Sequence, residues 1–447
     1  MMRQPGIFGQ MVWDCYTVGL LGFRTTPNAS RKSITAKLDH AALTLLGAFP
    51  FLTGQVITEG RSTTNSGIYC IVPYAPHDGR SPVRVKDCSD LCPSYDEIMQ
   101  ADAPFSMLDG DILCPMKGMG YRYTERTVQP VFIVQANFIH GGLLLCFASM
   151  HQALDMNGQG VLIRLFAAAA RGEELDPEIV AMGNRDADRI VPPLKNDEVA
   201  LGHEEFRQPS SLAPSAPPLH LEPGTAPWRY WRFRRDKLIE LKTLAAESSP
   251  LVSTNDAVTA FYLQRLTSAR INSGRLDKTD EVRCLRAVDA RRSLVPSVPE
   301  GYLGHLVALG VTQLPAAQVQ QEALSSVASA VRQSVLKVDD HYVRSLATLI
   351  ANTADKTTIF YTARLRPGKD VCVSSWAQIK IENFDLGEPL GKPDFFRRPR
   401  LSEVPDLAYI MPRTKDGDMD LATSLFRDDV SGLQNDAAWM KYVEFIG

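Results

Sequence analysis

Residues 150–160 have the sequence Met150-His151-Gln152-Ala153-Leu154-Asp155-Met156-Asn157-Gly158-Gln159-Gly160. The apolar run 143–147 precedes this stretch, and apolar residues recur at helical spacing from Val161 to Phe166 behind it. The chain is therefore predicted to pass from a strand into a helix here. Such a junction is a common place for a reacting imidazole, because a rigid scaffold presents the side chain. His151 is thus a candidate general base.

Both motif residues also have purely structural interpretations. A histidine after a core strand is often a hydrogen-bonded interior residue, and Asp155 is suited to cap the following helix. Gly158-Gln159-Gly160 lacks the third glycine of a dinucleotide-binding turn, because Ile163 stands there. A Gly-x-Ser-x-Gly elbow, a His-Glu-x-x-His pair and a P-loop are absent from the sequence, so the sites they build are not expected.

Composition narrows the class of protein. With 447 residues, 45% of them hydrophobic, the chain is too long for one ordinary core, so at least two domains are expected. A net charge of −3 gives no long-range attraction to nucleic acid or to an anionic membrane. No signal peptide and no apolar run of about 20 residues is present, which predicts a cytoplasmic protein.

The eight cysteines do not form a metal-binding pattern. Cys88 and Cys92 are the only close pair, and no second Cys or His pair accompanies them. We therefore predict reduced cysteines and no metal site.

A Pro- and Ser-rich stretch divides the chain into near-equal halves. Residues 195–227 contain six prolines, at positions 209, 214, 217, 218, 223 and 227. A stretch of this composition is typical of a surface crossover between domains. The predicted organisation is an N-terminal domain over 1–194, a crossover over 195–227 and a C-terminal domain over 228–447.

Strands and helices alternate in both halves. Periodicity predicts helices over 32–48, from 158 onward, 236–246 with Asp236 as its cap, 257–270 capped from Ser253-Thr254-Asn255-Asp256, 318–337 and 341–350. Short apolar and β-branched runs predict strands over 68–72, 131–139, 142–150, 228–233, 370–375 and 407–411. The fold class is therefore mixed α/β.

Further motifs follow His151-x-x-x-Asp155 in a set order. They are Ser253 to Phe261, Asp289-Ala290-Arg291 with Pro299 to His305, Val373-Ser374-Ser375-Trp376, and Asp385 to Pro393. In this order the chain resembles the BAHD-type acyl-CoA-dependent acyltransferases, in the fungal branch that includes trichothecene O-acetyltransferases. Leu386, Glu388 and Pro389 depart from the Phe, Trp and Gly of the family's last signature, and His305 replaces an Asn.

The resemblance implies two similar-sized, chloramphenicol-acetyltransferase-like domains with a solvent tunnel between them, and a segment near 370–390 that packs back on the N-terminal domain. Acyl-CoA, expected to be acetyl-CoA, enters from one side as a co-substrate, and a small-molecule acceptor enters from the other. His151 deprotonates a hydroxyl of the acceptor, a secondary metabolite, or alternatively an amine, and the deprotonated group attacks the thioester directly. No bound cofactor and no acyl-enzyme are implied, and the protein is expected to be a monomer.

The resemblance also implies roles for single residues. Ser374 supplies a hydroxyl to the developing oxyanion. Asp155 points away from the chemistry and pairs with a basic group, while Asp385 pairs with Arg291 and braces the domain interface. Contacts with substrate or CoA are implied for Ser253, Thr254, Asp256, Ser375, Trp376 and Gly158.

Three questions stay open from the sequence. The basic clusters Arg232 to Arg235 and Arg397 to Arg400 either meet CoA phosphates or form solvated faces and local ion pairs. The donor is either acyl-CoA or a carrier-protein thioester, as in condensation-type enzymes. A degenerate, non-catalytic binding protein is the third possibility, and it rests on the altered last signature alone.

Overall fold

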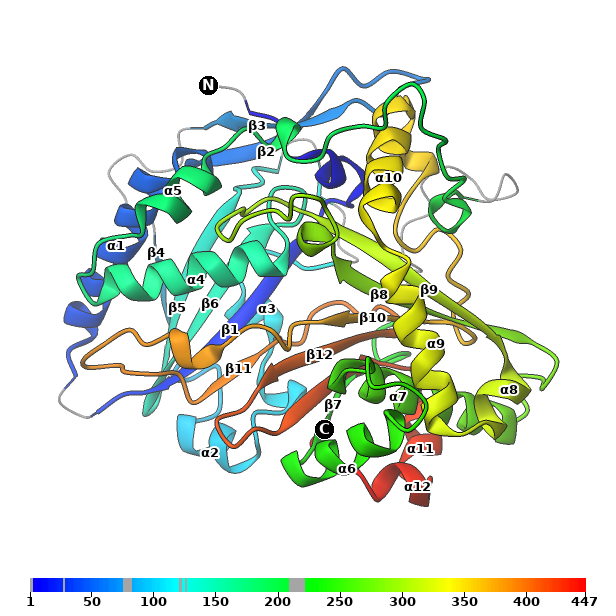
Figure 1. The fold of residues 1–447 in the computed structure, drawn as a ribbon. Coiled ribbons are helices and arrows are strands. Elements are labelled where there is room, and N and C mark those ends of the chain that lie inside the picture. The colour runs from blue at the N-terminus through cyan, green and yellow to red at the C-terminus, as the bar shows by residue number, and fades with distance from the viewer. Residues whose placement is uncertain (1–2, 27–28, 75–82, 120–122, 125–126, 209–221) are drawn as a thin grey trace.

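The computed structural model describes residues 3–26, 29–74, 83–119, 123–124, 127–208 and 222–447, and the part of the predicted crossover at 209–221 lies outside them. Within the described chain, strands form a five-stranded sheet, a seven-stranded sheet and a two-stranded pair (Figure 1). The pair consists of β2 (Gly54–Glu59) and β3 (Ile68–Pro73). The mixed α/β class is confirmed.

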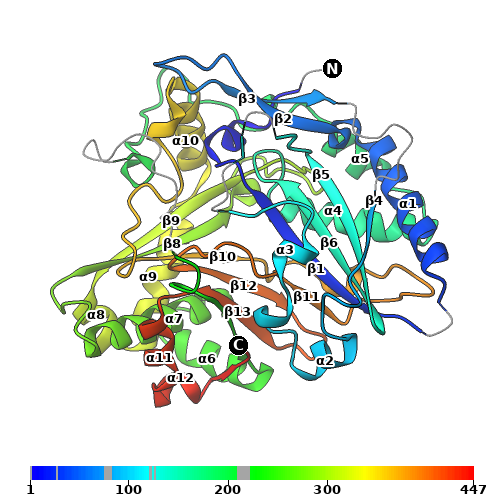
Figure 2. The ribbon, with the colours of Figure 1, turned by 180° about the vertical axis from the view of Figure 1, so that it is seen from behind.

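The first sheet carries the His151 loop at the end of one of its central strands. Its order is β11 (Phe395–Arg397), β1 (Tyr16–Arg24), β6 (Gly142–Met150), β5 (Phe132–Ile139) and β4 (Val83–Asp87). Every residue of β5 and β6 is buried, which explains their mostly apolar sequences. Helices α1 (Arg31–Ala48) and α4 (Met156–Ala170) cover one face, and Figure 2 shows the sheet from its other side.

The second sheet forms the opposite half of the molecule. Its order is β14 (Val443–Phe445), β7 (Trp228–Phe233), β13 (Met419–Ser424), β12 (Leu407–Arg413), β10 (Val371–Ser375), β8 (Glu281–Asp289) and β9 (Val307–Pro315). Helices α6 (Arg235–Ala245), α7 (Thr254–Asn272), α8 (Ala316–Gln321) and α9 (Leu324–Leu336) pack with it. Val371 and Val373 of β10 face this core, so Cys372 and Ser374 face the other way.

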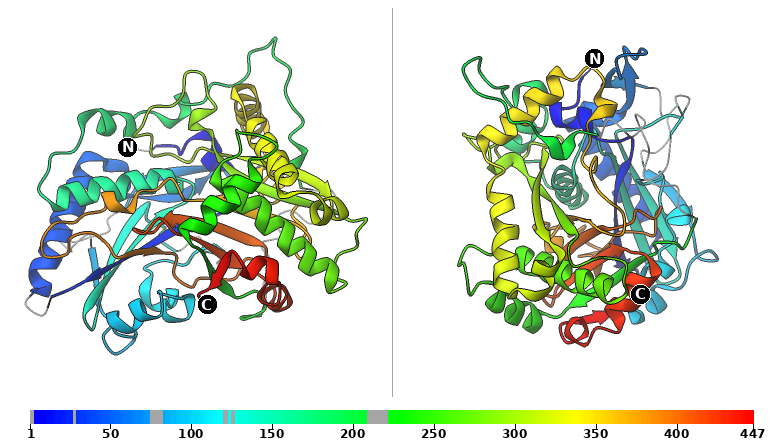
Figure 3. Two further views of the ribbon diagram at one scale, coloured as in Figure 1. Left: turned by 60° about the horizontal axis from the view of Figure 1, so that its bottom comes forward. Right: turned by 90° about the vertical axis from the view of Figure 1, so that its right-hand side faces the viewer.

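A segment of the second half of the chain completes the first sheet. β11 pairs with β1 in antiparallel register, with Arg397 opposite Leu20. Upstream of β11, the backbone carbonyl of Leu386 accepts a hydrogen bond from Lys37 of α1 at 3.1 Å. Figures 1 and 3 show this orange segment running from the second sheet to lie beside α4. The exact domain boundaries, including 1–194 and 228–447, stay a prediction.

Remaining helices surround the two sheets. They are α2 (Tyr95–Gln100), α3 (Gly110–Leu113), α5 (Pro177–Gly183), α10 (Asp340–Asn352), α11 (Arg427–Gln434) and α12 (Ala437–Met440).

Two details of the predicted elements are wrong. Asp236 does not cap α6, because the helix begins one residue earlier and Asp236 lies in its first turn. The predicted helix over 318–337 is two helices, since Glu322 and Ala323 have extended backbone between α8 and α9. The predicted strands over 142–150 and 228–233 are reproduced residue for residue. Seven strands of the two large sheets were not predicted from periodicity: β1, β4, β8, β9, β11, β13 and β14.

Candidate active site

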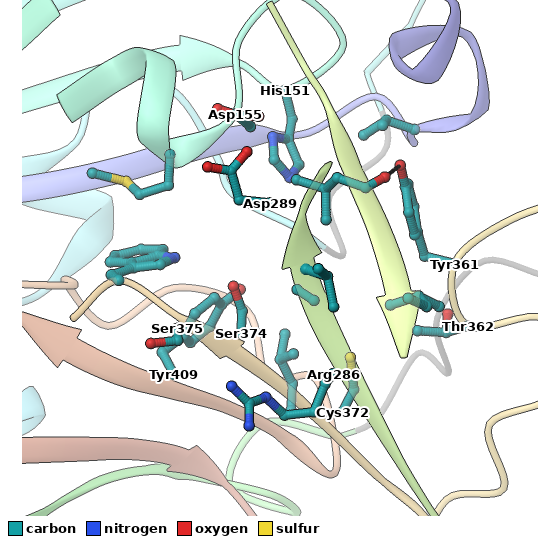
Figure 4. A pocket seen from close by; sticks show the side chains of 18 of the residues that line it. His151, Asp155, Arg286, Asp289, Tyr361, Thr362, Cys372, Ser374, Ser375 and Tyr409 are labelled. Atoms are coloured by element: carbon teal, nitrogen blue, oxygen red, sulfur yellow. Dashed lines mark hydrogen bonds between the residues drawn. The ribbon is translucent and has the colours of Figure 1, made fainter. Parts of the chain in front are cut away.

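A cavity of about 1200 Å³ lies between the two halves of the chain. Its lining includes β1 and the His151 loop from the first half, and β8, β9, β10 and β12 from the second half. Figure 4 shows His151 on one side of this space and Ser374 and Ser375 on the other. A group bound in the cavity can therefore contact residues from both sheets.

The imidazole of His151 is held in one tautomer. Its Nδ1 lies 3.0 Å from Thr17 Oγ1 and 3.1 Å from the backbone carbonyl of Leu154. A carbonyl only accepts, so the contact assigns the proton of the neutral ring to Nδ1 and leaves Nε2 with a lone pair. Burial lowers the pKa of His151 below its ordinary value of 6.5, against the opposing effects of Leu154 and Asp155. The ring is therefore neutral near pH 7, as a base must be.

Asp155 does not reach the imidazole. Its carboxylate caps α4 by accepting from the backbone N–H of Gly158 at 2.9 Å, and it accepts from Arg291 Nη1 at 2.8 Å. The N–H of Leu306 donates to it as well, at 2.9 Å. Burial alone would raise the pKa of Asp155, but Arg291 outweighs burial and the pKa lies below its ordinary value. Asp155 holds the turn, as the expected pairing with a basic group requires.

The predicted pairing of Asp385 with Arg291 is wrong. Arg291 is buried between Asp155, Asp289 and the backbone carbonyls of Tyr302 and Gly304. The Asp385 carboxylate instead accepts from the N–H of Gly387 at 2.8 Å, and its backbone carbonyl accepts from Arg171. The 385–391 turn therefore packs against the helices of the first half of the chain, and Asp385 is not among the partners of Arg291.

A second histidine lies beside the first. The rings of His151 and His305 pack edge to face with centroids 4.7 Å apart. His305 Nε2 lies 3.0 Å from the hydroxyl of Tyr361, which itself donates to the carbonyl of Val307. Burial, together with the neighbouring His151, lowers the pKa of His305 to about 3. His305 is thus a neutral wall of the cavity rather than a second acid.

Ser374 lies across the cavity from His151. It belongs to β10, where it pairs with Tyr409 of β12 in parallel register. Its side chain lines the cavity, and within the described residues its hydroxyl has no hydrogen-bond partner. The hydroxyl is therefore free to donate to a bound oxygen.

The predicted contact residues differ in their surroundings. Ser253, Asp256, Ser375 and Trp376 line the cavity, whereas Thr254 and Gly158 are not part of its lining. Asp256 forms the capping box of α7 with Ser253 and pairs with Arg286 at 3.0 Å and with Arg332.

Gly158 is a packing position, which contradicts its predicted contact with substrate. A Cβ on Gly158 would lie 2.0 Å from the backbone carbonyl oxygen of Leu303. The glycine is needed because α4 approaches the 302–306 segment closely.

Sequence reasoning missed several cavity residues. Asn255 donates to Ser375 Oγ at 3.0 Å, although it stood inside the quoted capping motif. Thr17 and Tyr361 orient the two histidines, and Tyr409 stands opposite Ser374. None of the three belongs to a local pattern, so no signal in the sequence pointed to them.

Most arginines of the two basic clusters, 232–235 and 397–400, form local ion pairs. Arg232 and Arg397 share Asp420, and Arg234 pairs with Asp418. Arg400 pairs with Asp109, so Arg398 alone of the three arginines in 397–400 lines the cavity.

Among the described residues, no group of three or more His, Cys, Asp or Glu side chains could hold a metal ion. No helix in the same residues is long and apolar enough to cross a membrane.

Comparisons with known proteins agree with this geometry. Residues 112–440 match the Transferase family, and residues 15–170 match the trichothecene 3-O-acetyltransferase-like N-terminal domain. The chain is 35% identical to the O-acyltransferase pigD of Monascus ruber, over 100% of this chain and 99% of that protein. It is 34% identical to the trichothecene 3-O-acetyltransferase TRI101 of Fusarium sporotrichioides, over 99% and 96%.

Solved structures of other proteins share the fold of this chain over nearly its whole length. The crystal structure of F. sporotrichioides TRI101 complexed with coenzyme A and T-2 superposes with a TM-score of 0.91 at 31% identity, covering 100% of both chains. The F. graminearum TRI101 complex with coenzyme A and deoxynivalenol gives 0.92 at 31%, also over 100% of both. Vinorine synthase, at 15% identity over 99% of this chain and 93% of that chain and a TM-score of 0.67, shares the fold.

Proposed function

The chain belongs to the Transferase family and is an acyl-CoA-dependent O-acyltransferase, and we propose that His151 is the general base that activates the acceptor hydroxyl. The acceptor is a secondary metabolite, as for the fungal relatives, and we propose acetyl as the acyl group. The observation that carries the proposal is the Nδ1 contact with Leu154, which leaves Nε2 of a cavity-lining histidine unprotonated.

The proposed reaction has one tetrahedral intermediate. Nε2 of His151 takes the proton of the acceptor hydroxyl, whose oxygen forms a bond to the thioester carbon. The carbonyl π electrons move to oxygen, and the Ser374 hydroxyl donates a hydrogen bond to that oxyanion; a donor of this kind is worth about 10²–10³ in rate. The intermediate then collapses, the C–S bond breaks, and the imidazolium returns its proton to the CoA thiolate. Products are the O-acyl ester and CoA.

No protein nucleophile is required for this sequence. Cys15 and Cys372 line the cavity, but burial raises the pKa of each thiol to about 12, so neither supplies a thiolate near neutral pH. Direct attack by the acceptor therefore fits the cavity better than an acyl-enzyme.

The mechanism is tested by replacing the base. His151→Ala is expected to lower kcat by about 10²–10⁴ while acetyl-CoA binding measured by calorimetry stays within a few-fold, because the base acts on the acceptor and not on the donor. Turnover is followed as CoA release that depends on added acceptor. Full-rate transfer by His151→Ala would contradict the proposal.

The choice of donor is tested separately. The same acyl group is offered on CoA and on a carrier protein, with the wild-type enzyme and one acceptor. Faster turnover with acyl-CoA is expected, since coenzyme A is bound in the TRI101 structures that superpose over the whole chain. A monomeric state and a cytoplasmic location stay predictions.

A further inference from the structure

One buried arginine in the cavity lacks a counter-charge. Six arginines of the described chain are buried: Arg232, Arg270, Arg286, Arg291, Arg397 and Arg398. The first five each pair with a carboxylate, of Asp420, Asp406, Asp256, Asp155 and Asp420 respectively. Arg398 is 3% exposed, and within the described residues no carboxylate pairs with it. A buried charge without a partner costs several kcal/mol, which makes this exception informative.

The guanidinium of Arg398 packs against two aromatic rings and makes no hydrogen bond to the described residues. Its Cζ lies 4.5 Å from the ring centroid of Trp228 and 4.8 Å from that of Tyr409. The hydroxyl of Tyr230 fixes its backbone, accepting from the N–H at 2.8 Å and donating to the carbonyl at 2.9 Å. Nη1 is buried and has no hydrogen-bond partner among the described residues. Aromatic packing thus orients the side chain but leaves its donors unused.

Arg398 lies close to the proposed reacting centre. Its ring partner Tyr409 is the register partner of Ser374. On the other side, Arg398 acts electrostatically on the Cys15 thiol, and the backbone carbonyl of Cys15 accepts from the N–H of His151 at 2.9 Å. Apolar residues of the same cavity lining include Trp376, Val404, Pro405 and Leu407.

The position of Arg398 near the proposed reacting centre limits which anionic group of a substrate can reach it. The phosphates of CoA are separated from its thioester by the whole pantetheine arm, so they cannot lie beside Arg398 while the thioester lies at His151. A carboxylate near the reacting carbon fits instead, because its two oxygens match the fork of a guanidinium. Desolvated, aromatic-lined surroundings strengthen such a pair.

We propose that Arg398 binds a carboxylate carried by a substrate, either on the acceptor or at the far end of the acyl group. The inference rests on the proposed function for the identity of the two substrates. Two substrate pairs satisfy it: either the preferred acceptor is a hydroxy acid and the acyl group is acetyl, or the preferred donor is the CoA thioester of a dicarboxylic acid, which then replaces acetyl-CoA.

Binding of matched probes tests the proposal and separates the two sources. Malonyl-CoA is compared with acetyl-CoA, and 4-hydroxybenzoate is compared with the neutral 4-hydroxybenzamide, using the full-length protein. Calorimetry measures the first pair and ligand-observed NMR the second. We expect the carboxylate to bind about tenfold or more tightly than its neutral match in one pair, the range of a charge-assisted hydrogen bond.

Variants test whether Arg398 causes the preference for the carboxylate probe over its neutral match. R398Q is expected to abolish it while leaving the affinity of the neutral probe unchanged, and R398K to keep part of it, because the charge remains without the fork. R413Q is the control, since among the described residues the Arg413 side chain donates only to the Gly417 carbonyl, at an exposed turn. Absence of a preference in both pairs, its survival in R398Q, or an equal loss for both members of a pair would overturn the proposal.

The preference for a carboxylate at Arg398 does not depend on His151 acting as the general base. His151→Ala should lose transfer and keep the carboxylate preference, because binding at Arg398 needs no proton transfer. Failure of the general-base proposal and failure of the carboxylate proposal are therefore seen in different measurements.

Discussion

Single side chains in this cavity owe their chemistry to neighbours both near and remote in sequence. His151 takes its tautomer from Leu154 and Thr17, and its lowered pKa from burial. Asp155, four residues away, serves the turn through Arg291 instead of the imidazole. The His-x-x-x-Asp motif therefore combines one reacting residue with one positioning residue.

The lowered pKa of His151 predicts the acid limb of the reaction. Protonation removes the base, so kcat/KM should rise with pH and level off. Because the folded pKa lies below 6.5, the midpoint of that limb should fall below pH 6.5, and activity should persist at more acidic pH than a free imidazole would allow. The profile is measured with acetyl-CoA and one acceptor.

An independent titration checks the assignment. The ring of His151 is followed by NMR in histidine-labelled protein, and His151→Gln identifies its signal by absence. A kinetic midpoint at or above pH 6.5, or one that differs from the NMR value of the free enzyme, would contradict the assignment.

At the scale of elements, the start of α4 joins the two halves of the chain. Asp155 caps the helix and binds Arg291 of the 290–292 turn, while Gly158 lets the 302–306 segment approach. Helix capping alone is worth about 1 kcal/mol, whereas breaking a buried ion pair costs about 3–5 kcal/mol. Most of the contribution of Asp155 is therefore made across the interface.

Asp155→Asn separates the two contributions. Asparagine still caps the helix, but it leaves Arg291 without its main counter-charge, so the free energy of unfolding should fall by about 3–5 kcal/mol. Asp385→Asn is the matched control, because the asparagine oxygen can still accept from the Gly387 N–H and no buried arginine loses its carboxylate, so it should cost about 0–1 kcal/mol. Urea denaturation followed by tryptophan fluorescence measures both, and equal losses would refute the assigned roles.

In the whole molecule, a buried charge network ties the two sheets together. Asp420 of β13 accepts from Arg232 of β7 at 2.9 Å and from Arg397 of β11 at 2.6 Å. Since β11 belongs to the first sheet and β13 to the second, one carboxylate bridges them.

Asp420→Asn should loosen that junction. Two buried arginines lose their shared carboxylate, so we expect a loss of about 3–5 kcal/mol and faster amide exchange along β11 and β1. Asp111→Asn removes an exposed pair with Lys117 and should cost about 0–1 kcal/mol. Hydrogen exchange read by mass spectrometry locates the effect, and unchanged protection at β1 would argue against a bridging role.

The sequence by itself determined many of the elements and the proposed base. Hydrophobic periodicity is a local property, so it predicted the strands 142–150 and 228–233 and the helix that follows Gly158. His151 lies at the junction between the strand 142–150 and that helix. Tertiary structure decided the partners. Arg291 pairs with Asp155, 136 residues away, and not with Asp385. Arg398 has no carboxylate partner among the described residues, whereas Arg397 and Arg400 beside it in the sequence each pair with one. Charge pairing depends on which strands meet in space, and no local pattern records that.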